Sequence, residues 1–178
     1  MADEPDTLRD PLTGLPGRTL FLDRLEQALA RGRRRPDKLC AVLLLDLDGF
    51  AAVNEGQGRA RGDELLRAVA VRLQQGLRGA DSVARLGGDA FAFLIEEVEG
   101  VPDATRTASR VLADVSAPFE VSGQPVSLSG SIGVVIGVTS YPRAEDVLRD
   151  AAVALDGARA RGTGHHQVFD RALGPPPA

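Results

Sequence analysis

The chain has 178 residues, of which 43% are hydrophobic and 26% are charged, and its formal net charge is −4 at pH 7. This composition is typical of one soluble domain with a single core, and the acidic balance excludes a general nucleic-acid-binding protein, which normally carries a basic face. The absence of any run of about 18 apolar residues and the polar start MADEPDTLRD exclude a membrane span and a secretory signal, so we expect a cytoplasmic protein.

The part of the chain up to Leu77 predicts a helix, a buried strand and a second helix. Apolar residues at helical spacing predict a helix over residues 17–31, after the turn DPLTGLPG. The nearly continuous apolar run Leu39–Leu47 predicts a central strand covered on both faces. The segment NEGQGRARGD predicts a turn-rich connection, and the spacing that follows predicts a helix over Glu64–Leu77.

A hairpin and a mixed set of elements follow. In Ser82–Glu97, two apolar runs of strand length are joined by Gly87-Gly88-Asp89-Ala90, which predicts a tight bend that presents one carboxylate. The remaining expected elements are a helix over Asp103–Val115, a strand over Pro118–Val121, a strand in VSLSGSIGVVIG, a helix over Arg143–Arg161 and a short last strand in HQVF. This order predicts an α+β fold with a mostly antiparallel sheet.

Acidic side chains mark the ends of two predicted strands. If these strands are neighbours, Asp46 and Asp89 converge at one end of the sheet, and paired carboxylates there suit Mg²⁺. Acids at strand ends also cap turns, and we interpret Asp48 in that way. From spacing alone, both interpretations of Asp46 and Asp89 stay open.

Two other residue types, cysteine and histidine, have simpler interpretations. Cys40 lies alone in an apolar run, which indicates a buried thiol acting as a small hydrophobe. His165 and His166 have no partners at metal-ligand spacing, so we expect them at the solvated start of a strand.

Three motifs resemble one family. DPLTGLPGR, LLLDLDGFAAVNEGQGRARGDELL and RLGGDAF, in this order, are similar to the GGDEF family of diguanylate cyclases, and the likeness extends from about Asp10 to Phe169. It implies a ferredoxin-like or polymerase-palm-like domain over residues 10–170, with flexible ends at 1–9 and 171–178. It further implies a dimer in which each domain holds one GTP and the two substrates are joined into cyclic di-GMP.

The resemblance also assigns roles to residues. It implies that Asp46, Asp89 and the Leu47 carbonyl bind Mg²⁺, and that Asp89 is the retained catalytic acid. It implies that Asn54 and Asp63 bind the guanine of GTP. An aspartate can accept hydrogen bonds from the guanine N1 and N2 hydrogens, and an asparagine can meet the remaining polar edge.

The phosphate site departs from the family pattern. Ala90 replaces the second acid of the Gly-Gly-Asp/Glu-Glu-Phe signature, and Ala51 and Thr163 replace basic residues. Arg159 remains in place of a family lysine, and the Gly87-Gly88 pair lets backbone approach the phosphates. Because each missing charge-assisted contact is worth about 1.5 to 3 kcal/mol, we expect impaired catalysis and weakened GTP binding.

A second binding pattern is intact. Arg78 and Asp81 match the Arg-x-x-Asp inhibitory site at which many members of the family bind cyclic di-GMP. The arginine can stack on guanine and donate to it, and the aspartate can accept from it. Arg106 and Arg110, on the next predicted helix, are the candidates for the second arginine of such a site.

We therefore predict a degenerate GGDEF domain that binds cyclic di-GMP, and GTP with Mg²⁺ where GTP is bound, to regulate a partner. That partner is a second copy or another protein, with no role for nucleic acid or membrane. The alternatives are an active diguanylate cyclase with feedback inhibition, a GTP-binding interaction module, and a relic half of a longer enzyme with a phosphodiesterase domain.

Overall fold

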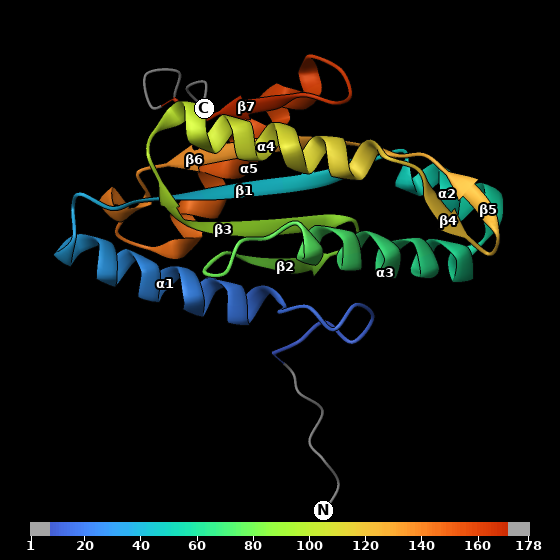
Figure 1. Ribbon diagram of the computed structural model, residues 1–178, viewed down its shortest axis with the longest axis horizontal. Helices are drawn as coiled ribbons and strands as arrows, with labels where there is room; N and C mark the ends of the chain where they lie inside the picture. Colours follow the sequence, from blue (N-terminus) through green and yellow to red (C-terminus); the bar gives the residue numbers. More distant parts are fainter. Residues whose placement is uncertain (1–7, 171–178) are drawn as a thin grey trace, which may run out of the picture.

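Helices and strands follow one another in a mixed order along the chain (Figure 1). The computed structural model describes residues 8–170. The helices are α1 (Arg18–Arg34), α2 (Phe50–Gln57), α3 (Arg59–Gln75), α4 (Val101–Ser116) and α5 (Ala144–Ala160), with a 3-10 turn η1 (Val138–Ser140). The strands are β1 (Leu39–Asp48), β2 (Ser82–Gly87), β3 (Ala90–Val98), β4 (Phe119–Val121), β5 (Gln124–Val126), β6 (Ser129–Ile136) and β7 (His166–Val168). None of these helices is long and apolar enough to cross a membrane.

One five-stranded sheet has the strand order β2-β3-β1-β6-β7, and β4 and β5 form a separate pair. All neighbouring strands are antiparallel except β6 and β7, which are parallel. This arrangement confirms the α+β fold with a mostly antiparallel sheet. The expected flexible ends lie outside the described residues, apart from Leu8 and Arg9.

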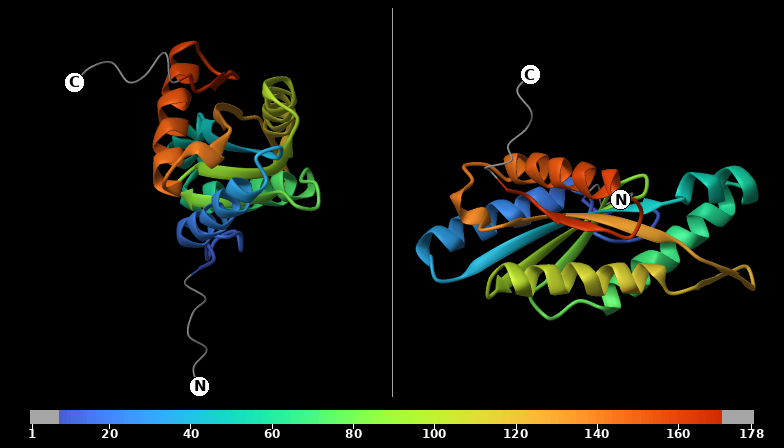
Figure 2. Two further views of the ribbon diagram at one scale, coloured as in Figure 1. Left: turned by 90° about the vertical axis from the view of Figure 1, so that its left-hand side faces the viewer. Right: turned by 90° about the horizontal axis from the view of Figure 1, so that it is seen from above.

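The sheet is covered on both faces, as the ribbon views show (Figure 2). One core joins the sheet to α3 and α4, and a second joins its other face to α1 and α5. Along β1, Leu43 and Leu45 belong to the first core, whereas Val42 and Leu44 belong to the second. Because alternate side chains of a strand point to opposite faces, a strand buried on both sides is apolar throughout, as predicted.

The central strand pairs with the predicted hairpin. Strand β1 lies between β3 and β6, and Asp46 is in register with Ala90 on one side and Ser131 on the other. The backbone N–H of Leu47 donates to the carbonyl oxygen of Asp89 at 3.3 Å. The expectation that the strands of Asp46 and Asp89 are neighbours is therefore confirmed.

The prediction for NEGQGRARGD was wrong, because most of this segment is helical. Helix α2 begins after Gly49, whose φ of 82° only glycine adopts readily, and its first residue, Phe50, is buried. Gly58, with a φ of 90°, then separates α2 from α3. Burial of Phe50 against the core stabilises a helix that the local turn-forming residues disfavour.

The strand expected in VSLSGSIGVVIG is confirmed as β6, but it is shorter than the segment, because Val126 belongs to β5. Gln124–Val126 pairs with β4 as a small hairpin outside the main sheet, and the chain joins the main sheet only from Ser129 onward. The side chain of Glu64 holds this hairpin, since its carboxylate accepts hydrogen bonds from the backbone N–H of Ser122 at 2.9 Å and from its hydroxyl at 2.8 Å.

Candidate functional site

Asp46 lies near the end of β1, and its side chain is 13% exposed. One carboxylate oxygen, Oδ2, forms an ion pair with Arg159 from the last turn of α5. The other oxygen, Oδ1, is buried and has no hydrogen-bond partner in the described part of the chain. A buried carboxylate oxygen without a partner is costly, so this atom marks a place where a cation or a hydrogen-bond donor would bind favourably.

Asp89 lies in the turn between β2 and β3. Gly87 and Gly88 have φ values of 138° and 51°, which glycine adopts without strain. Burial raises the pKa of the Asp89 carboxyl, and the Asp89 backbone N–H and the Arg85 guanidinium oppose this rise. The hydrogen bond and the arginine therefore only partly offset the loss of water around the Asp89 carboxylate.

These two acids fit a divalent cation that takes most of its ligands from elsewhere. Residues 8–170 contain no group of three or more His, Cys, Asp or Glu side chains that could hold a metal ion by itself. Mg²⁺, however, commonly uses one or two protein carboxylates and completes its octahedron with water and substrate phosphates. The unpartnered Oδ1 of Asp46 and the desolvated carboxyl of Asp89 suit such a site, and the role of the Leu47 carbonyl stays a prediction.

The predicted guanine-binding residues lie at the junction of α2 and α3. The Oδ1 atom of Asn54 is buried without a hydrogen-bond partner among the residues described. Its side chain lies against Gly62, where an added Cβ would collide with Oδ1 and would lie 2.8 Å from Cγ. Asp63, the other predicted guanine ligand, follows directly and is half-buried. Gly62 therefore leaves room for Asn54, a role that the sequence analysis did not assign.

The predicted dinucleotide site is a turn beside a cavity. The backbone N–H of Asp81 donates to the carbonyl of Arg78 at 2.9 Å, and Asp81 Oδ1 accepts from the backbone N–H of Glu96 at 3.2 Å. Arg78, Asp81 and Arg110 line a cavity of about 210 Å³. The Nε of Arg110 is buried and has no hydrogen-bond partner within residues 8–170. The structure thus brings Arg110 to Arg78 and Asp81.

Arg106, the other candidate for the second arginine of the site, lies next to this cavity. Arg106 lines a neighbouring hollow of about 520 Å³, which it shares with Arg78. Glu97 and Asp103 line both spaces, so the two are contiguous along α4. The sequence alone could not choose between Arg106 and Arg110, because both lie on the same helix four residues apart.

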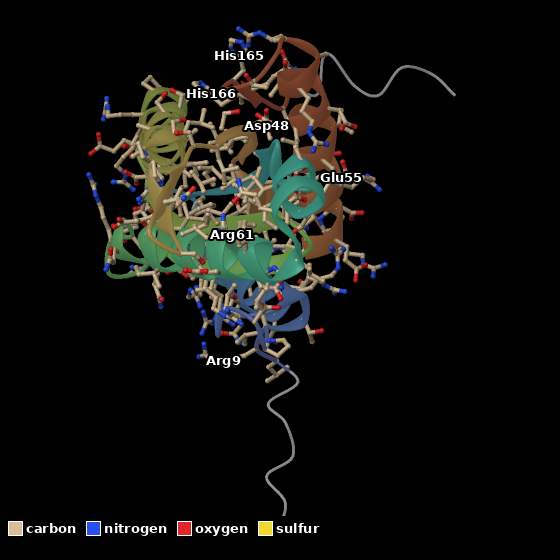
Figure 3. All side chains as sticks on the ribbon, turned by 90° about the vertical axis from the view of Figure 1, so that its right-hand side faces the viewer. Arg9, Asp48, Glu55, Arg61, His165 and His166 are labelled. Atoms are coloured by element: carbon tan, nitrogen blue, oxygen red, sulfur yellow. The ribbon has the colours of Figure 1, made fainter. Side chains whose placement is uncertain are left out.

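Asp48 has a different role from the one expected. Its carboxylate accepts hydrogen bonds from the hydroxyl groups of Ser129 at 3.3 Å and Ser131 at 3.1 Å, so it ties β1 to β6 and does not cap a turn. In the view of Figure 3, Asp48 lies between α2 and the pair His165 and His166. Both histidines are half-buried at the start of β7, and burial lowers the pKa of His166.

Comparison with known proteins agrees with the fold. The family described as "Diguanylate cyclase, GGDEF domain" matches residues 7–165. The chain belongs to the GGDEF family. Among curated GGDEF proteins of Pseudomonas aeruginosa, the bifunctional diguanylate cyclase/cyclic di-GMP phosphodiesterase MucR is 39% identical over 93% of this chain, and the diguanylate cyclase TpbB is 38% identical over 90%. This chain covers only 24% and 37% of their respective lengths.

Solved GGDEF domains share the fold. The isolated GGDEF domain of TpbB has a TM-score of 0.85 and 36% identity, covering 91% of this chain and 94% of that one. The diguanylate cyclase SiaD of P. aeruginosa, solved with its activator SiaC, has a TM-score of 0.83 and 29% identity, covering 91% of this chain and 62% of that one. The GGDEF domain of DgcB from Caulobacter crescentus, solved with cyclic di-GMP, has a TM-score of 0.83 at 24% identity and covers 93% and 98% of the two chains, which shows a common fold.

Proposed function

We propose that this GGDEF domain is a receptor for cyclic di-GMP with impaired cyclase activity. The observation that carries the proposal is the cavity shared by Arg78, Asp81 and Arg110, in which the Arg110 Nε lacks a partner among the described residues. The bound dinucleotide would regulate a protein partner or a second copy of the chain. Because GTP and cyclic di-GMP are the ligands, the proposal places the domain in the cytoplasm.

The cavity offers the contacts that a guanine dinucleotide requires. Asp81 already uses Oδ1 to accept from the Glu96 backbone, and a carboxylate retains further lone pairs for the N1 and N2 hydrogens of guanine. Arg78 is exposed, so its planar guanidinium is free to stack on a base. Arg110 supplies a donor for a phosphate or a guanine oxygen. The contiguous hollow beside Arg106 gives room for a ligand larger than one nucleotide.

Replacing Arg78 by alanine tests this site. We expect Arg78→Ala to weaken cyclic di-GMP binding about tenfold to a hundredfold, because hydrogen bonds from a charged group are worth about 1.5 to 3 kcal/mol. Calorimetric titration of wild type and variant measures the change. Arg67→Ala is the matched control, since Arg67 is exposed on α3 and lines none of the cavities around Arg78. Equal affinity of wild type and Arg78→Ala would contradict the assignment.

We infer impaired catalysis from Ala90, the residue paired with Asp46 on the neighbouring strand. Ala90 is in register with Asp46, so a methyl group occupies the position of the second signature acid. Asp46, Asp89 and the Leu47 carbonyl would hold Mg²⁺, which would neutralise the phosphates of bound GTP. Gly87 and Gly88 would bring backbone close to those phosphates, and Arg159 would contact them once it leaves Asp46. With Ala51 and Thr163 in place of basic residues, the triphosphate has few cationic partners from the chain.

A second candidate function is GTP binding, with or without slow turnover. The observation that favours it is the unpartnered Oδ1 of Asn54, which has no other evident role in the fold. Formation of cyclic di-GMP from GTP and Mg²⁺ by the purified protein, lost in Asp89→Ala, would establish an active cyclase. Saturable GTP binding without product would instead establish an interaction module.

Gly62→Ala tests the nucleotide pocket apart from the dinucleotide site. The added methyl group would displace the Asn54 side chain, so we expect GTP affinity to fall about tenfold, as for the loss of one or two hydrogen bonds. Cyclic di-GMP affinity should not change. Gly56→Ala is the control, because Gly56 is exposed on α2 and an added Cβ there meets nothing within 4 Å. Unchanged GTP affinity in Gly62→Ala would argue against Asn54 as a guanine ligand.

A further inference from the structure

The loop of residues 8–17, which precedes α1, is closed on itself and docked on β2. The backbone N–H of Gly17 donates to Leu8 O at 2.8 Å, and the N–H of Asp10 donates to Leu15 O at 2.7 Å. The backbone N–H of Arg85 then donates to Pro16 O at 3.0 Å. The loop therefore has a defined shape and a fixed contact with the strand that leads into the Gly87–Ala90 turn.

The side chain of Arg85 connects this loop to the turn. Its Nε and Nη2 donate to the carbonyl oxygen of Gly88 at 3.0 and 2.8 Å. Its Nη1 donates to Asp10 Oδ1 at 2.8 Å, in an ion pair whose side chains are only 13% and 12% exposed. A guanidinium provides this rigid fork, whereas the ammonium of a lysine is a single point charge that cannot reproduce it.

Asp10 is itself held in place. Its second oxygen, Oδ2, accepts from the backbone N–H of Thr13 at 2.9 Å and from the Thr13 hydroxyl at 2.6 Å. Both carboxylate oxygens are therefore occupied, one by the loop and one by Arg85. A carboxylate fixed in this way fixes the orientation of the guanidinium that it binds, and with it the carbonyl of Gly88.

We propose that Arg85 is a positioning residue for the Gly87–Ala90 turn and that Asp10 holds Arg85 in the orientation in which it donates to the Gly88 carbonyl oxygen. The DPLTGLPG loop, 75 residues away in sequence, then sets where the turn presents Asp89. A displacement of the loop would reach the turn through one buried ion pair. This positioning of the turn can be tested without any assumption about function. Its effect on nucleotide binding rests on the proposed function.

Hydrogen exchange at Leu47 measures this coupling without any ligand, because the Leu47 N–H donates to Asp89 O. In Arg85→Lys and in Asp10→Asn we expect the Leu47 amide to exchange about tenfold faster or more, with shifted resonances for Gly88 and Asp89. Asp23→Asn is the control, because Asp23 is exposed on α1 and accepts only from Gln27 among the hydrogen bonds described. Amides at the centre of β1, such as Val42, should exchange at the wild-type rate.

Two results would overturn the inference. Wild-type exchange at Leu47 with unshifted turn resonances would show that the turn keeps its geometry without the ion pair. Equal acceleration at Leu47 and Val42 would show that the ion pair stabilises only the fold as a whole. A parallel titration separates this proposal from the proposed function: Asp10→Asn should weaken GTP binding with Mg²⁺ and leave cyclic di-GMP binding unchanged, and if wild type binds no GTP the exchange data still decide.

Discussion

Replacing Ala90 by glutamate is expected to raise the rate of cyclic di-GMP formation from GTP and Mg²⁺ on the order of a hundredfold or more. Residue 90 is in register with Asp46 and follows Asp89 directly, so a carboxylate there would add negative charge where two acids already converge. Preorganised charged groups at such positions typically contribute this much to a rate. Chromatography of timed incubations measures the product.

The charge, and not the size, of the new side chain should cause this gain. Ala90→Gln has nearly the same shape without the charge and should remain as slow as wild type. Removal of Asp89 from the Ala90→Glu protein should abolish the gain. If wild type forms cyclic di-GMP at a measurable rate that Ala90→Glu does not exceed, the chain is an efficient cyclase and Ala90 is tolerated.

Replacing Gly133 by alanine should cause the largest loss of stability among the glycine substitutions proposed for this chain. Gly133 lies on β6, where an added Cβ would collide with the Ala151 carbonyl oxygen and lie 2.5 Å from the Leu155 backbone nitrogen, both on α5. Because helix backbone cannot rotate away as a side chain can, we expect the free energy of unfolding to fall by about 1 to 3 kcal/mol or more.

Thermal unfolding measures this effect. For a protein of this size, each kcal/mol lowers Tm by roughly 2 to 4 °C. Gly56→Ala is the matched control, and it should leave Tm unchanged or slightly raised because alanine is the better helix former. A Gly133→Ala protein as stable as wild type would mean that α5 can move away from the sheet at little cost, and Arg159, which α5 carries, would then not be rigidly placed.

Much of the fold was predictable because it depends on local pattern. The apolar run Leu39–Leu47 required a strand covered on both faces, and it became the centre of the sheet. The Gly87-Gly88 pair required a tight turn, which the positive φ values confirm. Once β1 and β3 were neighbours, the meeting of Asp46 with the Asp89 turn followed from register.

The remaining features depend on contacts between distant residues. The helix over part of NEGQGRARGD forms because Phe50 is buried, and this contact leaves no periodic signal in the sequence. Which of the two candidate arginines shares a cavity with Arg78 and Asp81 depends on how α4 is rotated against the sheet, and it is Arg110 that does so. The pairing of Asp10 with Arg85 depends on a loop that docks on a strand, although both residues lie in motifs that the sequence analysis had already singled out.

The most direct test of the central claim is a titration of isotopically labelled protein with cyclic di-GMP, followed by amide chemical shifts. We predict saturable shifts at Arg78–Ser82, at Glu96 and along the Asp103–Arg110 face of α4, with the Gly87–Ala90 turn unaffected. Absence of saturable shifts would contradict a receptor function. Shifts confined to the turn and to Asn54 would place the dinucleotide in the nucleotide pocket and would contradict the site of Arg78 and Asp81.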